Sequence, residues 1–132
     1  MSNRHVTHDV NGAMDSNVLF DVVEIFKSLS DPTRAQLVFL LTEQEYSVND
    51  LAAIVDVSAS AVSHHLAKLR AARLVRTRRS GNHIFYSVDD AHVAALFREA
   101  LYHLDHVRRN LPDHPYTSGQ AQPVQPQVEV TP

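Results

Sequence analysis

Residues 58–88 read SASAVSHHLAKLRAARLVRTRRSGNHIFYSV, and this stretch decides the fold. Its first half carries large apolar side chains at helical spacing, at Val62, Leu66 and Leu69. Ser58 and Ser60 precede them, and the hydroxyl of either serine can accept a hydrogen bond from the first backbone N–H groups of a helix. The pattern predicts a helix that one of these two serines caps.

Two β-rich runs follow this helix, from Leu74 to Arg78 and from His83 to Val88. The residues between them, Arg79 to Asn82, include Gly81, which suits the tight turn of a hairpin. Upstream, a short helix opened by Ser47 and Asp50 ends at a break just before Ser58. Two short helices, a tight break and a hairpin predict a mainly α winged helix-turn-helix with a two-stranded β wing.

Other helices surround this motif. Apolar spacing from Val18 to Leu29 is mostly helical, and Asp31-Pro32 has the form of a helix start. Asp89-Asp90 caps a last helix that reaches about Arg109. Leu37, Leu40 and Leu41 continue the helix that Asp31-Pro32 opens, and in the short helix that follows Leu51, Ile54 and Val55 are expected to face inward.

Three segments follow from this pattern. Residues 17–110 are expected to form the folded winged-helix domain. Residues 1–16 are polar and without periodicity, which predicts a mobile arm. Residues 111–132 are rich in proline among Gln, Thr and Val, which predicts a disordered tail.

The predicted second helix of the motif has a polar outer face, formed by Ser60, Ser63, His64 and Lys68. Small hydroxyls near its start, including that of Ser58, can reach base edges or phosphates, and the longer side chains can extend into the major groove. His65 lies at the edge of the apolar face, so it either packs inward or contacts DNA. In the wing, Arg78 and Arg79 lie near the expected tip, where they suit the minor groove or the backbone.

Charge distribution supports a nucleic-acid partner. The chain has a net charge of −3, but no Asp or Glu occurs between Val57 and Val88. Half of the chain's 12 lysines and arginines lie between Lys68 and Arg79. A local basic segment on an acidic protein is the footprint expected for phosphate contacts.

Composition excludes several other classes. The chain has no cysteine, which excludes disulfides, thiolate metal sites and a cysteine nucleophile. Its start lacks the apolar run of a signal peptide, and its longest apolar stretch, Leu37 to Leu41, is far too short for a membrane span. We therefore expect a soluble cytoplasmic protein.

Several of these segments together resemble the ArsR/SmtB metalloregulators, over about residues 18–110. The motifs that carry the resemblance are Asp31-Pro32-Thr33-Arg34, Ser47 to Ala52, Ser60 to Arg70 and Ala72 to Val75. The resemblance implies a homodimeric winged-helix repressor that leaves its palindromic operator when a metal ion binds. It also implies target genes for metal efflux or homeostasis.

The last predicted helix carries Asp90 and His92 at its start and His103 and His106 near its end. At ~100° per residue, His103 lies ~20° from His92 around the helix axis and His106 ~40° to the other side. The histidines form one stripe, which borders an apolar face suited to dimerisation, formed by Val93, Leu96, Ala100, Leu104 and Val107.

Distance prevents these residues from sharing an ion within one helix. Eleven residues rise ~16 Å, while metal–nitrogen bonds are ~2 Å long. If two copies pack antiparallel, Asp90 and His92 of one chain meet His103 and His106 of the other, and each dimer has two equivalent sites. Three imidazoles and one carboxylate complete a tetrahedral Zn(II) shell, and the same positions match the last-helix zinc-type sites of the family.

The identity of the metal stays open between zinc and nickel or cobalt. Family members that detect soft metals place cysteines in or near the third helix, where this chain has none, so soft-metal sensing is not expected. The resemblance also implies that nickel and cobalt sensors add ligands from the termini. The candidates for these here are His5, His8 and His114.

The resemblance further implies a coupling route, in which the free ring N–H of His103 donates to a backbone carbonyl near Arg73. Two rival functions remain. A metal-dependent hydrolase needs an open coordination position and a general base, but the chain has no HExxH motif and only three glycines. The other rival is a winged-helix protein that binds DNA constitutively or responds to something other than metal.

Overall fold

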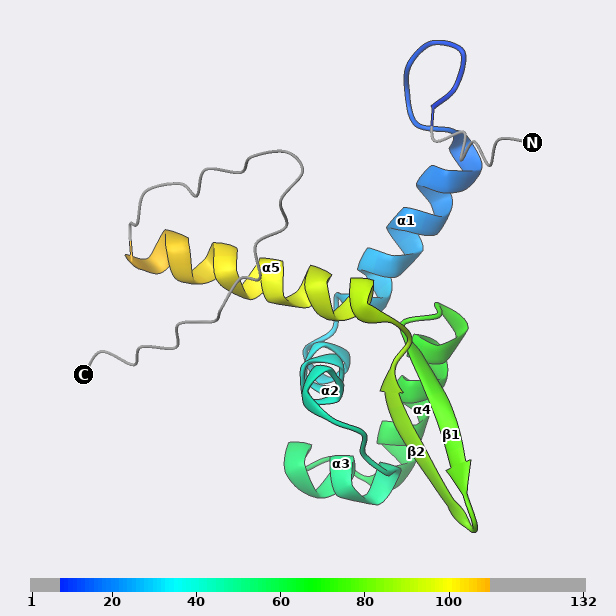
Figure 1. The fold of residues 1–132 in the computed structure, drawn as a ribbon, viewed down its shortest axis with the longest axis vertical. Helices are drawn as coiled ribbons and strands as arrows, with labels where there is room; N and C mark the ends of the chain where they lie inside the picture. The colour runs from blue at the N-terminus through cyan, green and yellow to red at the C-terminus, as the bar shows by residue number, and fades with distance from the viewer. Residues whose placement is uncertain (1–7, 110–132) are drawn as a thin grey trace. The chain divides into compact units, whose positions relative to one another are not determined.

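The computed structural model describes residues 8–109 (Figure 1). The chain divides between Asp89 and Asp90 into two compact units, and each is described by itself. His5 and His114, and the predicted tail, lie outside the described residues. Within residues 8–109, no helix combines the length and the apolar character needed to cross a bilayer.

Four helices and a hairpin make up the first unit. The helices are α1 (Ser16–Leu29), α2 (Pro32–Glu43), α3 (Val48–Val55) and α4 (Ala59–Ala71), and the strands are β1 (Val75–Ser80) and β2 (His83–Val88). The second unit begins at Asp90 and contains α5 (Ala91–Arg109). This order of elements is the one predicted from the sequence.

Side-chain caps start the helices of the first unit. Asp15 accepts hydrogen bonds from the backbone at the start of α1, Asp31 from Arg34 N and Ser47 from Asp50 N. Of the two serines considered for α4, Ser58 is the cap, with its Oγ 3.1 Å from Ala61 N. Each cap satisfies a backbone N–H that has no partner inside its own helix.

The core of the first unit lies where α2, α3, α4 and the wing meet. Its buried apolar side chains are Leu37, Val38, Leu41, Leu51, Val62, Leu66, Leu69, Leu74 and Val75. Two details differ from the predicted core. Ile54 was expected to face inward, but its side chain is 49% exposed, and Val38 is fully buried although the prediction omitted it. Only one face of the eight-residue α3 packs on α4, and Leu51 occupies that face.

The wing is an antiparallel hairpin in which Val75 pairs with Val88 and Ser80 with His83. β1 starts one residue later and ends two residues later than predicted, so Arg79 and Ser80 belong to the strand and only Gly81 and Asn82 remain in the turn. Gly81 has φ 59°, a left-handed conformation that glycine adopts without steric cost at the first position of such a turn. Tyr46, in the segment between α2 and α3, exchanges two backbone hydrogen bonds with Tyr86 of β2 and so ties the wing to that segment.

In the turn that follows α4, an arginine occupies a left-handed conformation that glycine usually adopts. Arg73 has φ 58°, and Leu74 N bonds back to Leu69 O at 2.9 Å. This closing turn satisfies a late carbonyl of the helix and directs the chain into β1. The turn joins α4 to the wing without an intervening loop, so the two elements have a short, well-defined connection.

The segment before α1 also has local order. Asp9 accepts hydrogen bonds from Asn11 N and Ala13 N, and His8 forms a β-bridge with Met14. This turn lies in the part of the chain that the sequence predicted to be a mobile arm. α1 begins at Ser16, one residue before the predicted start of the folded domain.

Candidate functional site

α4 presents a polar surface opposite the core. Val62, Leu66 and Leu69 are fully buried, while Ser60, Ser63, His64 and Lys68 are exposed. These four residues were predicted to face DNA. Their exposure leaves their hydroxyl, imidazole and ammonium groups accessible to a ligand on this face.

α3 and α4 form the helix-turn-helix. Asp56 ends α3 in a left-handed conformation with φ 55°, and two residues later Ser58 caps α4. The two helices pack against each other (Figure 1), and Leu51 is buried within the surrounding core. A tight turn between packed helices holds the second helix at the surface, which is the arrangement that inserts a helix into a major groove.

The two wing arginines have different surroundings. Arg78 Nε lies 3.0 Å from Glu45 Oε2, and its guanidinium lies 5.0 Å from the centre of the Phe85 ring. Arg79 is the next residue, so its side chain points to the opposite face of the hairpin, and it is exposed. No local sequence pattern indicates that Glu45 would contact Arg78, because the two residues are 33 positions apart in the chain.

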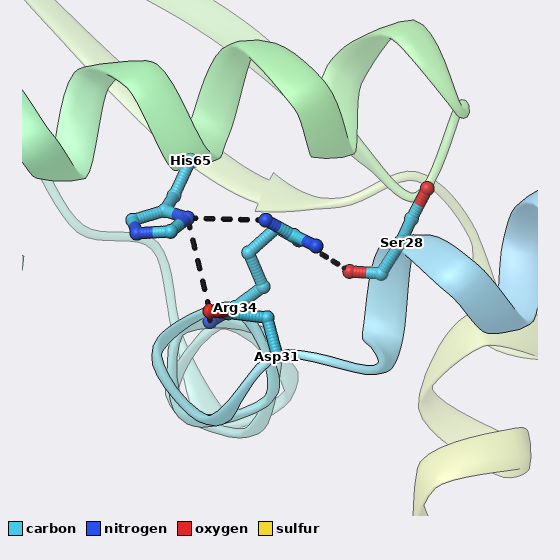
Figure 2. A network of polar contacts seen from close by, with 4 residues as sticks. All are labelled: Ser28, Asp31, Arg34 and His65. Atoms are coloured by element: carbon cyan, nitrogen blue, oxygen red, sulfur yellow. Dashed lines mark hydrogen bonds and ion pairs between the residues drawn. The ribbon is translucent and has the colours of Figure 1, made fainter.

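His65 lies on the inner side of α4, next to α2 (Figure 2). Its Nδ1 lies 3.3 Å from Arg34 Nη1 and 3.8 Å from Asp31 Oδ2. The side chain is 20% exposed, in contrast to the exposed His64. Of the two alternatives drawn from the sequence, this geometry favours packing over DNA contact.

In the second unit, Asp90 caps α5. Its Oδ1 accepts hydrogen bonds from His92 N at 2.9 Å and Val93 N at 3.2 Å. The bond from Val93 is the main cause that lowers the pKa of Asp90, so this carboxylate is ionised at neutral pH. The side chain of His92 is 97% exposed, with Nδ1 3.5 Å from the same carboxylate.

The predicted metal ligands lie at the two ends of α5. Asp90 and His92 are together at its start, and His103 and His106 lie in its last turns. Among residues 8–109 of this single chain, no three His, Asp or Glu side chains gather into a group able to hold a metal ion. His8, a candidate extra ligand, lies in the turn before α1.

Both terminal helices of the described chain expose apolar side chains. On α5, Leu96, Leu104 and Val107 of the predicted dimerisation face are exposed, as is Ala100, while Val93 is half-buried. α1 also exposes Leu19, Phe20, Val23 and Phe26, which lie in a predicted helix for which no function was expected. On each helix taken by itself, several exposed apolar side chains are typical of a surface that contacts another protein.

Comparisons with known proteins agree with this architecture. Residues 31–77 match the family model described as bacterial regulatory protein, arsR family. The chain is 47% identical over 103 residues to the HTH-type transcriptional regulator KmtR of Mycobacterium tuberculosis, covering 78% of this chain and 79% of that protein. It is 49% identical over 83 residues to the transcriptional repressor SmtB homolog of Synechocystis, covering 63% of each chain.

A solved structure extends the similarity to the fold. The homodimeric winged helix-turn-helix DNA-binding domain Mb0332 from Mycobacterium bovis has a TM-score of 0.70 and 26% identity, covering 75% of this chain and 92% of that one. The predicted winged-helix fold is confirmed, and the hydrolase alternative is set aside because the relatives are transcription regulators. The chain is therefore a member of the ArsR family of DNA-binding, winged-helix transcriptional regulators.

Proposed function

We propose that this regulator is a metal-responsive repressor. It binds a palindromic operator as a homodimer and releases it when Zn(II) binds between the α5 helices, which derepresses genes of metal efflux or homeostasis. The observation that carries the proposal is the distribution of donors on α5, with Asp90 and His92 at one end and two histidines at the other.

The donors on α5 fit zinc in their chemistry. Three imidazoles and one carboxylate make a closed tetrahedral set of nitrogen and oxygen ligands. Asp90 is ionised, as a ligand must be, and its capping bonds fix its position at the helix start. The two donor pairs are ~16 Å apart along the helix axis, so a complete set needs a second chain packed antiparallel.

Each chain contributes its own residues to the mechanism. In the operator complex, the exposed face of α4 enters the major groove, with Ser60, Ser63 and His64 at base edges and Lys68 near phosphate. Arg79 contacts the backbone from the wing. Bound Zn(II) would supply a fixed link between the two chains. If this link holds the two α4 helices at a spacing that does not match successive major grooves, the affinity for the operator is lowered.

His103 has a second role in this proposal. Its ring nitrogen that would not bind metal would donate to a backbone carbonyl near Arg73, just after α4. Such a hydrogen bond would connect the ligand set to the recognition helix. His106 is a ligand without that connection, so the two histidines are expected to differ in their effect on DNA release.

The binding test begins with selection of duplexes from a random library by the chelated protein. Fluorescence anisotropy then gives the affinity for the best duplex with EDTA and with Zn(II). We expect Zn(II) to weaken binding by about tenfold or more, in line with typical coupling free energies. His103→Gln should lose this response even where metal still binds, and the exposed wing variant His83→Gln should keep it. Release of DNA by His103→Gln like that of the unaltered chain would contradict the coupling role.

Titration with Co(II) distinguishes the metals. Intense visible bands that saturate at one ion per chain indicate tetrahedral sites and favour zinc. Weak bands with demonstrated binding indicate octahedral sites and favour nickel or cobalt, with His5, His8 or His114 as added ligands. An affinity for DNA that stays the same in EDTA, Zn(II), Co(II) and Ni(II) would overturn metal sensing and leave a regulator that binds DNA without it.

A further inference from the structure

A polar cluster joins three helices of the first unit behind the DNA-facing side of α4 (Figure 2). Arg34, in the first turn of α2, donates from Nε to the backbone oxygen of Ser28 at the end of α1, at 2.7 Å. The same guanidinium lies 3.3 Å from Nδ1 of His65 on α4 through Nη1. Asp31 accepts from Arg34 N at 2.9 Å. One side chain therefore connects α2 to both α1 and α4.

The chemistry of the cluster fixes its hydrogen-bond directions. A guanidinium can only donate, so Nδ1 of His65 must accept and the ring proton must lie on Nε2. Asp31 lies 3.8 Å from the same nitrogen, too far for a hydrogen bond. The charge of Arg34 lowers the pKa of Asp31, after the larger effect of the capping bond from Arg34 N, so a carboxylate balances the guanidinium.

A directional contact adds to what core packing contributes to the rotation of α4. Val62, Leu66 and Leu69 keep the helix against the core through apolar contacts, and a hydrogen bond at the edge of that face restricts the rotation further. A rotation of about 20° around the helix axis moves the tip of an outer side chain by about 2 Å, given the radius of a helix with its side chains. A shift of that size breaks hydrogen bonds to base edges, whose lengths vary by only a few tenths of an ångström.

We propose that His65 is a positioning residue for DNA binding, held by Arg34, and that this cluster sets the orientation in which α4 presents its outer face. The hydrogen bond between Nδ1 and Arg34 is directional and lies at the edge of the apolar face of α4, and the His65 ring lies 6.2 Å from the ring of His64 on the outer face. Arg34 is in turn fixed by the Ser28 carbonyl, so α1 and α2 form the base against which α4 is oriented. The proposal rests on recognition of DNA by α4 and does not depend on metal sensing.

Two variants of His65 separate the hydrogen bond from the bulk of the ring. His65→Asn places an amide oxygen near the position of Nδ1 and keeps an acceptor for Arg34. His65→Leu keeps a side chain of comparable bulk and removes the acceptor. Arg34→Lys retains the positive charge but offers a point donor in place of the fork that serves two acceptors.

Binding is measured in EDTA, to the best duplex selected by the unaltered protein and to a scrambled duplex of the same length. We expect His65→Leu and Arg34→Lys to weaken binding to the selected duplex about tenfold, the effect of losing one hydrogen bond to a charged group. Binding to the scrambled duplex should stay unchanged, because phosphate contacts tolerate small rotations. His65→Asn should recover most of the loss.

A cycle of single and double variants tests whether the two residues act together. The double variant Arg34→Lys/His65→Leu should bind no more weakly than the weaker single variant. Thermal unfolding of each variant shows that binding is measured on folded protein. Additive losses, equal losses in His65→Asn and His65→Leu, or equal losses for both duplexes would overturn the proposal. Failure of the unaltered protein to select any duplex would instead contradict DNA binding itself.

Discussion

Asp31 combines a helix cap with a charge. Its carboxylate accepts the backbone N–H of Arg34, and this bond is the main cause that holds its pKa below the ordinary value. A group whose pKa is lowered on folding stabilises the fold above its unfolded-state pKa, and that contribution is lost as the pH falls through the folded-state value. Stability should therefore decrease on acidification below about pH 4.

The variant Asp31→Asn tests this dependence. Asparagine is also a good cap, so the variant should fold at neutral pH while losing the contribution of Asp31 to the acid-induced decrease in stability. Urea unfolding at a series of pH values measures the slope, and Asp21→Asn on exposed α1 removes the same charge as a control. A slope for Asp31→Asn equal to that of the unaltered protein would disprove the role of the carboxylate.

His65 illustrates what sequence can predict about one residue. Its place in the helical pattern put it at the edge of the apolar face, and that position allowed both packing and DNA contact. The choice depends on Arg34, which lies far away in the sequence and is brought close only by the packing of α2 on α4. No local pattern contains that information.

At the scale of elements, the turn that follows α4 contains a residue whose backbone conformation is energetically unfavourable. Arg73 has φ 58°, and a left-handed conformation costs a residue with a Cβ atom roughly 1–2 kcal/mol. Arg73→Gly should therefore stabilise the first unit by up to about 1 kcal/mol, once the greater freedom of glycine in the unfolded chain is subtracted. Denaturant midpoints measure the gain.

Asp56 provides a matched comparison because it ends α3 with nearly the same φ, 55°. Aspartate tolerates this conformation better than arginine, so Asp56→Gly should gain less than Arg73→Gly. Equal gains, or destabilisation by Arg73→Gly, would show that the arginine side chain contributes contacts that outweigh the strain.

Elements with local signals were predicted well, and those defined by distant contacts were not. The caps Asp31 and Ser47 can be recognised from the sequence, because their hydrogen bonds reach only three residues along the chain. The exposure of Ile54 depends on which face of α3 meets α4. The ion pair between Arg78 and Glu45 depends on how the wing folds back beside the end of α2.

At the scale of the whole molecule, charge is concentrated where DNA is expected. An acidic chain with an acid-free basic segment should bind duplexes with a strong dependence on salt. Arg79→Gln should reduce the slope of log affinity against log salt by about one, as expected for one phosphate contact. Arg98→Gln, on the exposed surface of α5, is the control and should leave the slope unchanged. Equal slopes for the two variants would remove the wing arginine from the phosphate contacts.

The stripe formed by His92, His103 and His106 on α5 can be predicted from residue spacing, because helical geometry is regular. Which residues share a face, and how far apart they lie, follows from the residue numbers alone. The ligand set stays a prediction, since its completion needs a second chain. The structure of one chain describes each half of the set separately.

The separation of the two donor pairs along α5 has a genetic consequence. In the proposed antiparallel dimer, a chain altered at Asp90 and His92 and another altered at His103 and His106 would each lack a different half of every site. Each mutant alone would form dimers without a complete site, but a mixed dimer would combine the intact halves into one working site and one doubly defective site. Co-expression of the two defective alleles should therefore restore part of the metal response, as intragenic complementation.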